Sequence, residues 1–146
     1  MYAKAVKLFL RLALSIGFLS AVADRFGLWG AKVSAWGNWD SFVEYTALLT
    51  TWGPDFMIPI LAGVATVAEV IFATLLLVGF KTELIAKLSG FLLLIFALSM
   101  TFSTGAKSAF DYSVFSASAA AFALSLMKEK YMEVDSLFHP DDSNIN

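Results

Sequence analysis

The sequence predicts an all-helical integral membrane protein: a four-helix transmembrane bundle with a tryptophan-rich outward loop that carries a short interfacial helix. Hydrophobic residues make up 59% of the 146-residue chain, and the mean hydropathy is +0.75. Charged residues account for only 15%, against roughly 25% in a soluble domain. Four apolar runs each approach the ~20 residues that a helix needs to cross a bilayer. A domain this small has no interior that could bury four such runs, so we expect them to lie in lipid.

The charged residues at the ends of the runs predict the topology. Lysine and arginine are retained on the cytoplasmic side of a membrane. One side would carry Lys4, Lys7, Arg11, Lys81, Lys87, Lys128 and Lys130, and the other only Arg25, Lys32 and Lys107. We therefore expect both termini in the cytoplasm. The expected parts are spans at about 5–26, 57–80, 84–104 and 110–127, an outward loop at 27–56 and a polar cytoplasmic tail at 128–146.

The first run also resembles a secretory signal. Basic residues precede LALSIGFLSAVA, which ends on a small-residue cleavage pattern at Ala21–Ala23. Cleavage there would leave three spans. We favour a retained helix, because Arg11 would interrupt a signal core and an even number of spans fits the charge distribution.

The outward segment contains all four tryptophans, Trp29, Trp36, Trp39 and Trp52. Ser41 and Glu44 have the spacing of a capping box, which predicts a helix from about Phe42 to Trp52. Its apolar residues recur at helical spacing, as in a helix that lies at a membrane interface. The segment is therefore expected to anchor the loop in an aromatic belt, or to form a lid over a site between the helix ends.

Glu69 lies in the middle of the apolar run GVATVAEVIFATLLLVGF, residues 63–80. At 1.5 Å per residue it is roughly 18 Å above Lys81, near the bilayer midplane. A carboxylate at that depth costs ~3 kcal/mol on insertion scales. We expect Glu69 either to be protonated or to pair with a cation such as Arg25 or Lys107. A hydrogen bond that pins two helices is the structural alternative to a function in proton transfer.

Five ionisable residues of the outward side are expected to form one set that points into the bundle, because polar groups facing lipid would be unsatisfied. They are Asp24, Arg25, Glu69, Lys107 and Asp111. The acids Glu69, Asp111 and Asp24 are candidates for general acid–base catalysis. Candidate substrate-binding residues are Arg25, Lys107, Trp36, Trp39 and Tyr112. Arg11 is expected instead to extend toward the cytoplasmic surface.

Several chemistries are excluded by composition. The chain has no cysteine, and its one histidine, His139, lies in the polar tail. An iron–sulfur cluster on cysteines and a haem held by two histidines within the membrane are therefore not expected. The net charge of −2, without a basic stripe, argues against nucleic acid. His139, Asp141 and Asp142 could bind a metal only weakly, and a solvated, mobile tail is the favoured interpretation, so no metal site is predicted.

Taken in order, four features of the sequence resemble the DoxX family of small bacterial membrane proteins. They are ADRFGLWG at 23–30, WGNWDSFVEYT at 36–46, Glu69, and GAKSAFDYSVFSASAAA at 105–121. The resemblance covers about Leu8 to Leu126. It implies a four-helix fold in the bacterial inner membrane and an association with the membrane subunit of thiosulfate:quinone oxidoreductase. It also implies that the five ionisable residues of the outward side are the polar positions of the family pattern.

Three functions follow as hypotheses. The leading one is a quinone-interacting subunit of a membrane redox system, in which buried acids handle protons and a partner subunit supplies electrons. The second is a non-catalytic scaffold or assembly partner whose small-residue faces pack against other chains. The third is a small-solute or proton transporter, which would need a homo-oligomer because four helices leave little room for a pore. Membrane lipid is a partner in all three.

Overall fold

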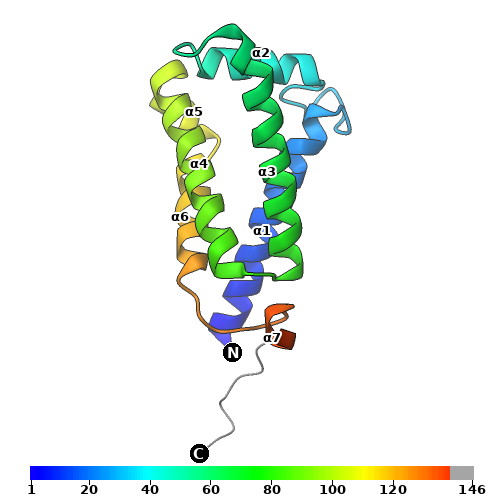
Figure 1. The fold of residues 1–146 in the computed structure, drawn as a ribbon, viewed down its shortest axis with the longest axis vertical. Helices are drawn as coiled ribbons and strands as arrows, with labels where there is room; N and C mark the ends of the chain where they lie inside the picture. The colour runs from blue at the N-terminus through cyan, green and yellow to red at the C-terminus, as the bar shows by residue number, and fades with distance from the viewer. Residues whose placement is uncertain (139–146) are drawn as a thin grey trace, which may run out of the picture.

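The computed structural model describes residues 1–138, and in that range the protein is helical, with no β-strand. The chain folds into an elongated bundle with one helix lying across its end (Figure 1). The elements are α1 Tyr2–Arg25, α2 Trp39–Leu49, the 3₁₀ turn η1 Asp55–Met57, α3 Ile58–Val78, α4 Thr82–Thr104, α5 Ala106–Asp111, α6 Val114–Ser125 and α7 Asp135–Phe138.

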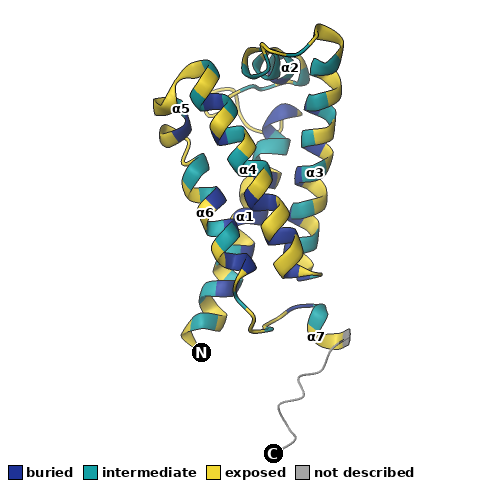
Figure 2. Ribbon diagram, turned by 60° about the vertical axis from the view of Figure 1, so that its left-hand side comes forward, coloured by how far each residue is buried: buried dark blue, intermediate teal, exposed yellow. Residues whose placement is uncertain are grey.

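Within residues 1–138, three helices are long and apolar enough to cross a membrane: α1, η1 with α3, and α4. Their outward surfaces carry large exposed apolar side chains, such as Ile16 on α1, Val64 on α3 and Ile95 on α4. Figure 2 shows exposed residues along the outside of these helices. A water-soluble bundle would bury such surfaces, whereas lipid solvates them. The predicted all-helical membrane class is confirmed at this level.

The fourth predicted span, 110–127, is not one continuous helix. It begins in α5, breaks at Tyr112 and Ser113, and continues as α6. Ser113 has φ of +56°, a left-handed conformation that is uncommon for a residue with a side chain. The twelve residues of α6 extend about 18 Å, which is shorter than the hydrocarbon layer.

Two helix pairs form the bundle, α1 against α3 and α4 against α6. Small residues let the second pair approach closely. Gly90 on α4 has no room for a Cβ, which would lie 2.9 Å from the Phe122 ring, and the Ser118 hydroxyl donates to the Gly90 carbonyl over 2.8 Å. The pairs meet in an apolar core that consists of Leu14, Leu76, Ile85, Ala86, Ala121 and Leu124.

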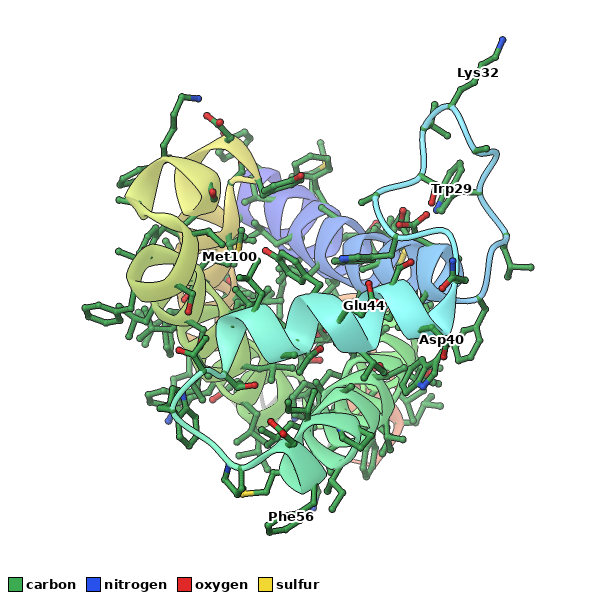
Figure 3. All side chains as sticks on the ribbon, turned by 90° about the horizontal axis from the view of Figure 1, so that it is seen from above. Trp29, Lys32, Asp40, Glu44, Phe56 and Met100 are labelled. Atoms are coloured by element: carbon green, nitrogen blue, oxygen red, sulfur yellow. The ribbon has the colours of Figure 1, made fainter. Side chains whose placement is uncertain are left out.

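Helix α2 crosses one end of the bundle, here called the α2 end (Figures 1 and 3). It begins at Trp39, three residues earlier than the sequence predicts, and ends at Leu49 rather than Trp52. Its cap is Asn38, whose side-chain oxygen accepts from the Ser41 amide over 2.9 Å. The predicted cap at Ser41 was wrong, because the helix begins three residues earlier and Asn38 is its N-cap.

The opposite end of the bundle, here called the turn end, holds the N-terminus, the α3–α4 turn and α7 (Figure 1). The turn depends on Gly79, which ends α3 at φ of +72°. A Cβ at Gly79 would lie 2.6 Å from Arg11 Nη2 and 2.7 Å from Glu133. Only glycine therefore allows this close approach.

Residues 128–138 fold back across the turn end and are here called the C-terminal strap. The Val134 amide donates to the Val78 carbonyl over 3.1 Å. The Asp135 carboxylate accepts from the Lys81 and Thr82 amides and so caps the start of α4. The prediction of a polar tail beyond residue 127 was incomplete, because its first eleven residues pack on the bundle. His139, Asp141 and Asp142 lie outside the described residues.

The strap buries two basic side chains of α1. Lys7 contacts Glu133 at 2.9 Å, and its ammonium also donates to the Glu129 carbonyl over 2.6 Å. Arg11 is 1% exposed. It donates to backbone carbonyls of α3 and of the strap, those of Leu76, Leu77, Tyr131 and Met132. The expectation that Arg11 extends to the surface was wrong, because the strap brings acceptors to the arginine.

Candidate functional site

The last turn of α1 lies beside the middle of α3, where Arg25 meets Glu69. Arg25 Nη2 donates to Glu69 Oε1 over 2.9 Å and lies 2.8 Å from Oε2. Both side chains are buried, at 3% and 2% exposure. The expected pairing of Glu69 with a cation therefore occurs, and Arg25 rather than Lys107 is the partner.

Thr66 completes the polar part of the site. It lies one turn before Glu69 on the same face of α3 and accepts a 2.7 Å hydrogen bond from Arg25 Nη1. Its own hydroxyl proton goes to the Ala62 carbonyl at 2.8 Å. The threonine is thus an acceptor with a fixed orientation, and the guanidinium is held on two sides.

Two aromatic rings cover the guanidinium. The Arg25 Cζ atom lies 3.8 Å from the centre of the Phe42 ring and 5.4 Å from that of Trp36. The two rings meet edge to face, with centres 5.1 Å apart. Cation–π contacts of this kind contribute about 0.5–2 kcal/mol each, more when water is excluded. The sequence placed Phe42 only on the apolar face of an interfacial helix, so its contact with Arg25 was not predicted.

Asp24 holds the loop that carries Trp36. Its carboxylate accepts from the Ser34 hydroxyl and, over 2.9 Å each, from the Ala35 and Trp36 amides. Both carboxylate oxygens are therefore occupied by the loop. Asp24 was predicted as a catalytic acid, but these bonds make it a positioning residue for the aromatic cover.

One polar atom of the buried pair, the Arg25 Nε–H donor, has no partner among the described residues. Glu69 Oε2 makes no hydrogen bond there, but it lies 2.8 Å from Arg25 Nη2 within the ion pair. A buried donor without a partner is costly and calls for an explanation. This donor could bind a small group that accepts a hydrogen bond.

Further aromatic residues extend the cover along α2 and the loop. Trp39 stacks on Phe26, with ring centres 5.8 Å apart, and its ring centre is 5.7 Å from that of Phe42. Tyr45 packs beside Trp36 at 5.8 Å. Burial, and secondarily the Tyr112 phenol, raise the pKa of Tyr45, so this phenol stays neutral at physiological pH.

Three predicted site residues do not join this cluster. Lys107 and Asp111 pair with each other over 2.5 Å on α5, and their side chains are 87% and 58% exposed. Tyr112 is 68% exposed. The expectation that all five ionisable residues point into the bundle was wrong for Lys107 and Asp111, because the break at Tyr112 and Ser113 separates α5 from the packed helix α6.

The described residues present no metal centre. Across residues 1–138, no three histidine, aspartate or glutamate side chains lie close enough together to hold an ion. The acids of the site are engaged by Arg25 and by the loop, as given above. The chemistry that the site offers is hydrogen bonding and proton exchange at a buried ion pair.

Comparisons of the chain with protein-family models, with curated proteins and with solved structures found no match. The resemblance to the DoxX family therefore depends on the residue patterns given above.

Proposed function

We propose that this chain is a DoxX-like protein of the bacterial inner membrane that binds a quinone headgroup at the Arg25–Glu69 pair, as a subunit of a membrane redox system. One observation carries the proposal. The unpartnered Arg25 Nε–H matches the carbonyl acceptor of a quinone, and the Glu69 carboxylate beside it would accept from the hydroxyl of a quinol. The Phe42 and Trp36 rings supply apolar walls beside them.

Reduction of a quinone to a quinol takes up two electrons and two protons. In the proposed reaction, Arg25 donates a hydrogen bond to a quinone oxygen and so favours the charge that develops there. Glu69 exchanges protons with the quinol hydroxyl as a general acid and base. The chain contains no cysteine, so a partner subunit would exchange the electrons with the quinone.

The proposal includes a four-span topology with cytoplasmic termini. The chain enters α5 at the α2 end and leaves α6 toward the turn end (Figure 1). The short helix α6 would complete its crossing with the residues on either side of it. The turn end carries seven lysines and arginines and the α2 end three, and by the positive-inside rule this distribution supports a cytoplasmic turn end.

Quinone content tests the proposal. The protein is purified in nanodiscs of native lipid, and bound quinone is extracted and quantified for wild type, Glu69→Gln and Lys107→Ala. Wild type should retain about one quinone per binding site, and Glu69→Gln should lose it. Lys107→Ala is the matched control, because its exposed ion pair lies outside the site, and it should retain quinone. Wild-type quinone no higher than in empty nanodiscs would refute the proposal.

A scaffold function is the second candidate, and one observation favours it. Arg25 is enclosed by Glu69, Thr66 and two rings, as a residue that locks α1, α2 and α3 together would be. In that case Glu69→Gln would change assembly with other chains and leave quinone content at the level of empty nanodiscs. Pull-down of partner membrane proteins with wild type and Glu69→Gln separates this candidate from the first.

A further inference from the structure

A groove of about 370 Å³ lies between the end of α2 and the outer half of α4. We propose that this groove is a binding site for one acyl chain and the ester linkage of a glycerophospholipid. Figure 3 shows α2 lying across the end of the bundle, next to α4. The lining residues are Leu49, Thr51, Trp52, Ile95, Leu98, Ser99, Phe102 and Ser103. The proposal concerns a different place from the Arg25–Glu69 pair and does not depend on the proposed function.

The groove continues the lipid-facing surface of the bundle. Ile95 and Leu98 form its deeper wall and belong to α4, which is long and apolar enough to cross a membrane. Their exposed fractions are 59% and 41%. The volume lies in the range of small-molecule pockets. A hydrocarbon chain fits such walls better than water does, because apolar walls offer water no hydrogen-bond partners.

Three hydroxyl groups line the groove, those of Thr51, Ser99 and Ser103. Neither the Thr51 nor the Ser99 hydroxyl has a hydrogen-bond partner among residues 1–138. Ser103, the third hydroxyl, is already bonded to the Leu49 carbonyl over 3.2 Å and closes the groove between the two helices. Ester carbonyls of a glycerophospholipid accept hydrogen bonds from hydroxyl groups. The rim therefore has two donors for the linkage.

The depth of the rim agrees with this ligand. Ser99 lies five residues before the end of α4 at Thr104, about 8 Å along the helix axis. Ile95 lies one turn deeper. Trp52, 75% exposed, stands at the mouth, where tryptophan is enriched at membrane interfaces. The hydroxyl donors lie nearer the membrane interface than Ile95 does. In a phospholipid, the ester linkage likewise lies nearer the interface than the acyl chain.

The groove on α3 provides a matched control. It is larger, about 550 Å³, and is lined by Pro59, Ile60, Gly63, Val64, Val67, Ala68, Ile71 and Phe72. None of these side chains carries a hydroxyl, so we expect only ordinary contact with surrounding lipid there.

Photo-crosslinking tests the proposal. Full-length protein is placed in nanodiscs containing a phosphatidylcholine with a diazirine on one acyl chain, and crosslinked residues are mapped by mass spectrometry. Crosslinks per exposed area should be more frequent at the α2–α4 groove than at the α3 groove. Thr51→Val should lower this excess about fivefold, as expected for loss of one hydrogen bond. Ser99→Phe, which fills the groove, should abolish it.

Ile16→Phe on α1, at an exposed apolar position outside both grooves, is the control for an added phenyl ring and should leave the excess unchanged. Folding of each variant is checked by its helical circular dichroism and its melting temperature. Equal crosslinking at the two grooves, or an excess that persists in folded Ser99→Phe, would overturn the proposal. Retention of a quinone in place of the phospholipid would overturn it too.

Discussion

Arg25 and Glu69 form a buried ion pair that joins helices α1 and α3, with Nη2 2.8 Å from Oε2. The residues are 44 positions apart in the chain. A carboxylate in a transmembrane helix is costly alone, and a guanidinium alone is costly too. Each charge therefore compensates the burial of the other, and the rings of Phe42 on α2 and Trp36 on the preceding loop cover the guanidinium.

The pair should show strong energetic coupling. Glu69→Gln and Arg25→Gln should each destabilise the fold by about 3 kcal/mol or more, because each leaves an uncompensated buried charge. The double variant should lose less than the sum of the two. Equilibrium unfolding of wild type, the two single variants and the double variant in detergent micelles measures the coupling energy of the pair. Effects that add to within about 0.5 kcal/mol would show that the two residues are independent.

Glu133 should stabilise the turn end through Lys7 and Arg11. Glu133→Gln leaves these buried cations without a carboxylate, and we expect a loss of about 3 kcal/mol. The control is Glu83→Gln, whose partner Lys128 is 3.6 Å away and 83% exposed, so its loss should stay below about 1 kcal/mol. The loss of stability in each variant is measured by thermal unfolding. Equal losses would mean that the strap does not hold the helices.

Gly79 should tolerate no side chain. Gly79→Ala places a Cβ within 2.7 Å of Arg11 and Glu133 at a positive φ, and should cost about 2 kcal/mol or more. Gly17→Ala in α1 is the control, because no atom lies within 4 Å of its added Cβ. That substitution should stabilise the helix by up to about 1 kcal/mol. Melting temperatures that move in the same direction for both variants would contradict this account of the turn.

Asp24 should control the order of the loop that carries Trp36. Asp24→Ala removes a charged acceptor from the Ala35 and Trp36 amides, so their hydrogen exchange should become about tenfold faster. Asp40→Ala, at an exposed position of α2, is the control and should leave these amides unchanged. Hydrogen exchange of the Ala35 and Trp36 amides is measured by mass spectrometry in both variants. Unchanged exchange rates of these amides in Asp24→Ala would show that Asp24 does not position the loop.

The sequence predicted that Glu69 is either protonated or paired with a cation such as Arg25 or Lys107, and the partner in the structure is Arg25. Glu69 lies in an apolar run that leaves a carboxylate no water, and Arg25 is at the end of the preceding run with a side chain long enough to reach it. The sequence likewise predicted the helical class and the positions of the three long apolar helices. Composition and run length determine these features, and neither depends on distant contacts.

The remaining features depend on contacts between segments that are far apart in the chain. Arg11 is buried only because Tyr131, Met132 and Glu133 of the C-terminal strap pack against it. The strap is a polar segment, and its sequence has no apolar periodicity that would predict this packing. Lys107 and Asp111 stay exposed because the chain breaks at Tyr112 and Ser113. No proline or glycine marks that break within 106–125, so a continuous apolar pattern predicted a continuous helix.

Infrared spectroscopy of a bound quinone tests the central claim most directly. Quinone labelled with carbon-13 at one carbonyl is added to wild type, Arg25→Gln and Lys107→Ala in nanodiscs, and the carbonyl stretch is recorded. A hydrogen bond from Arg25 should lower the stretching frequency in wild type and in Lys107→Ala, and the shift should disappear in Arg25→Gln. The frequency of quinone in empty nanodiscs, seen unchanged in all three proteins, would contradict a quinone site at the Arg25–Glu69 pair.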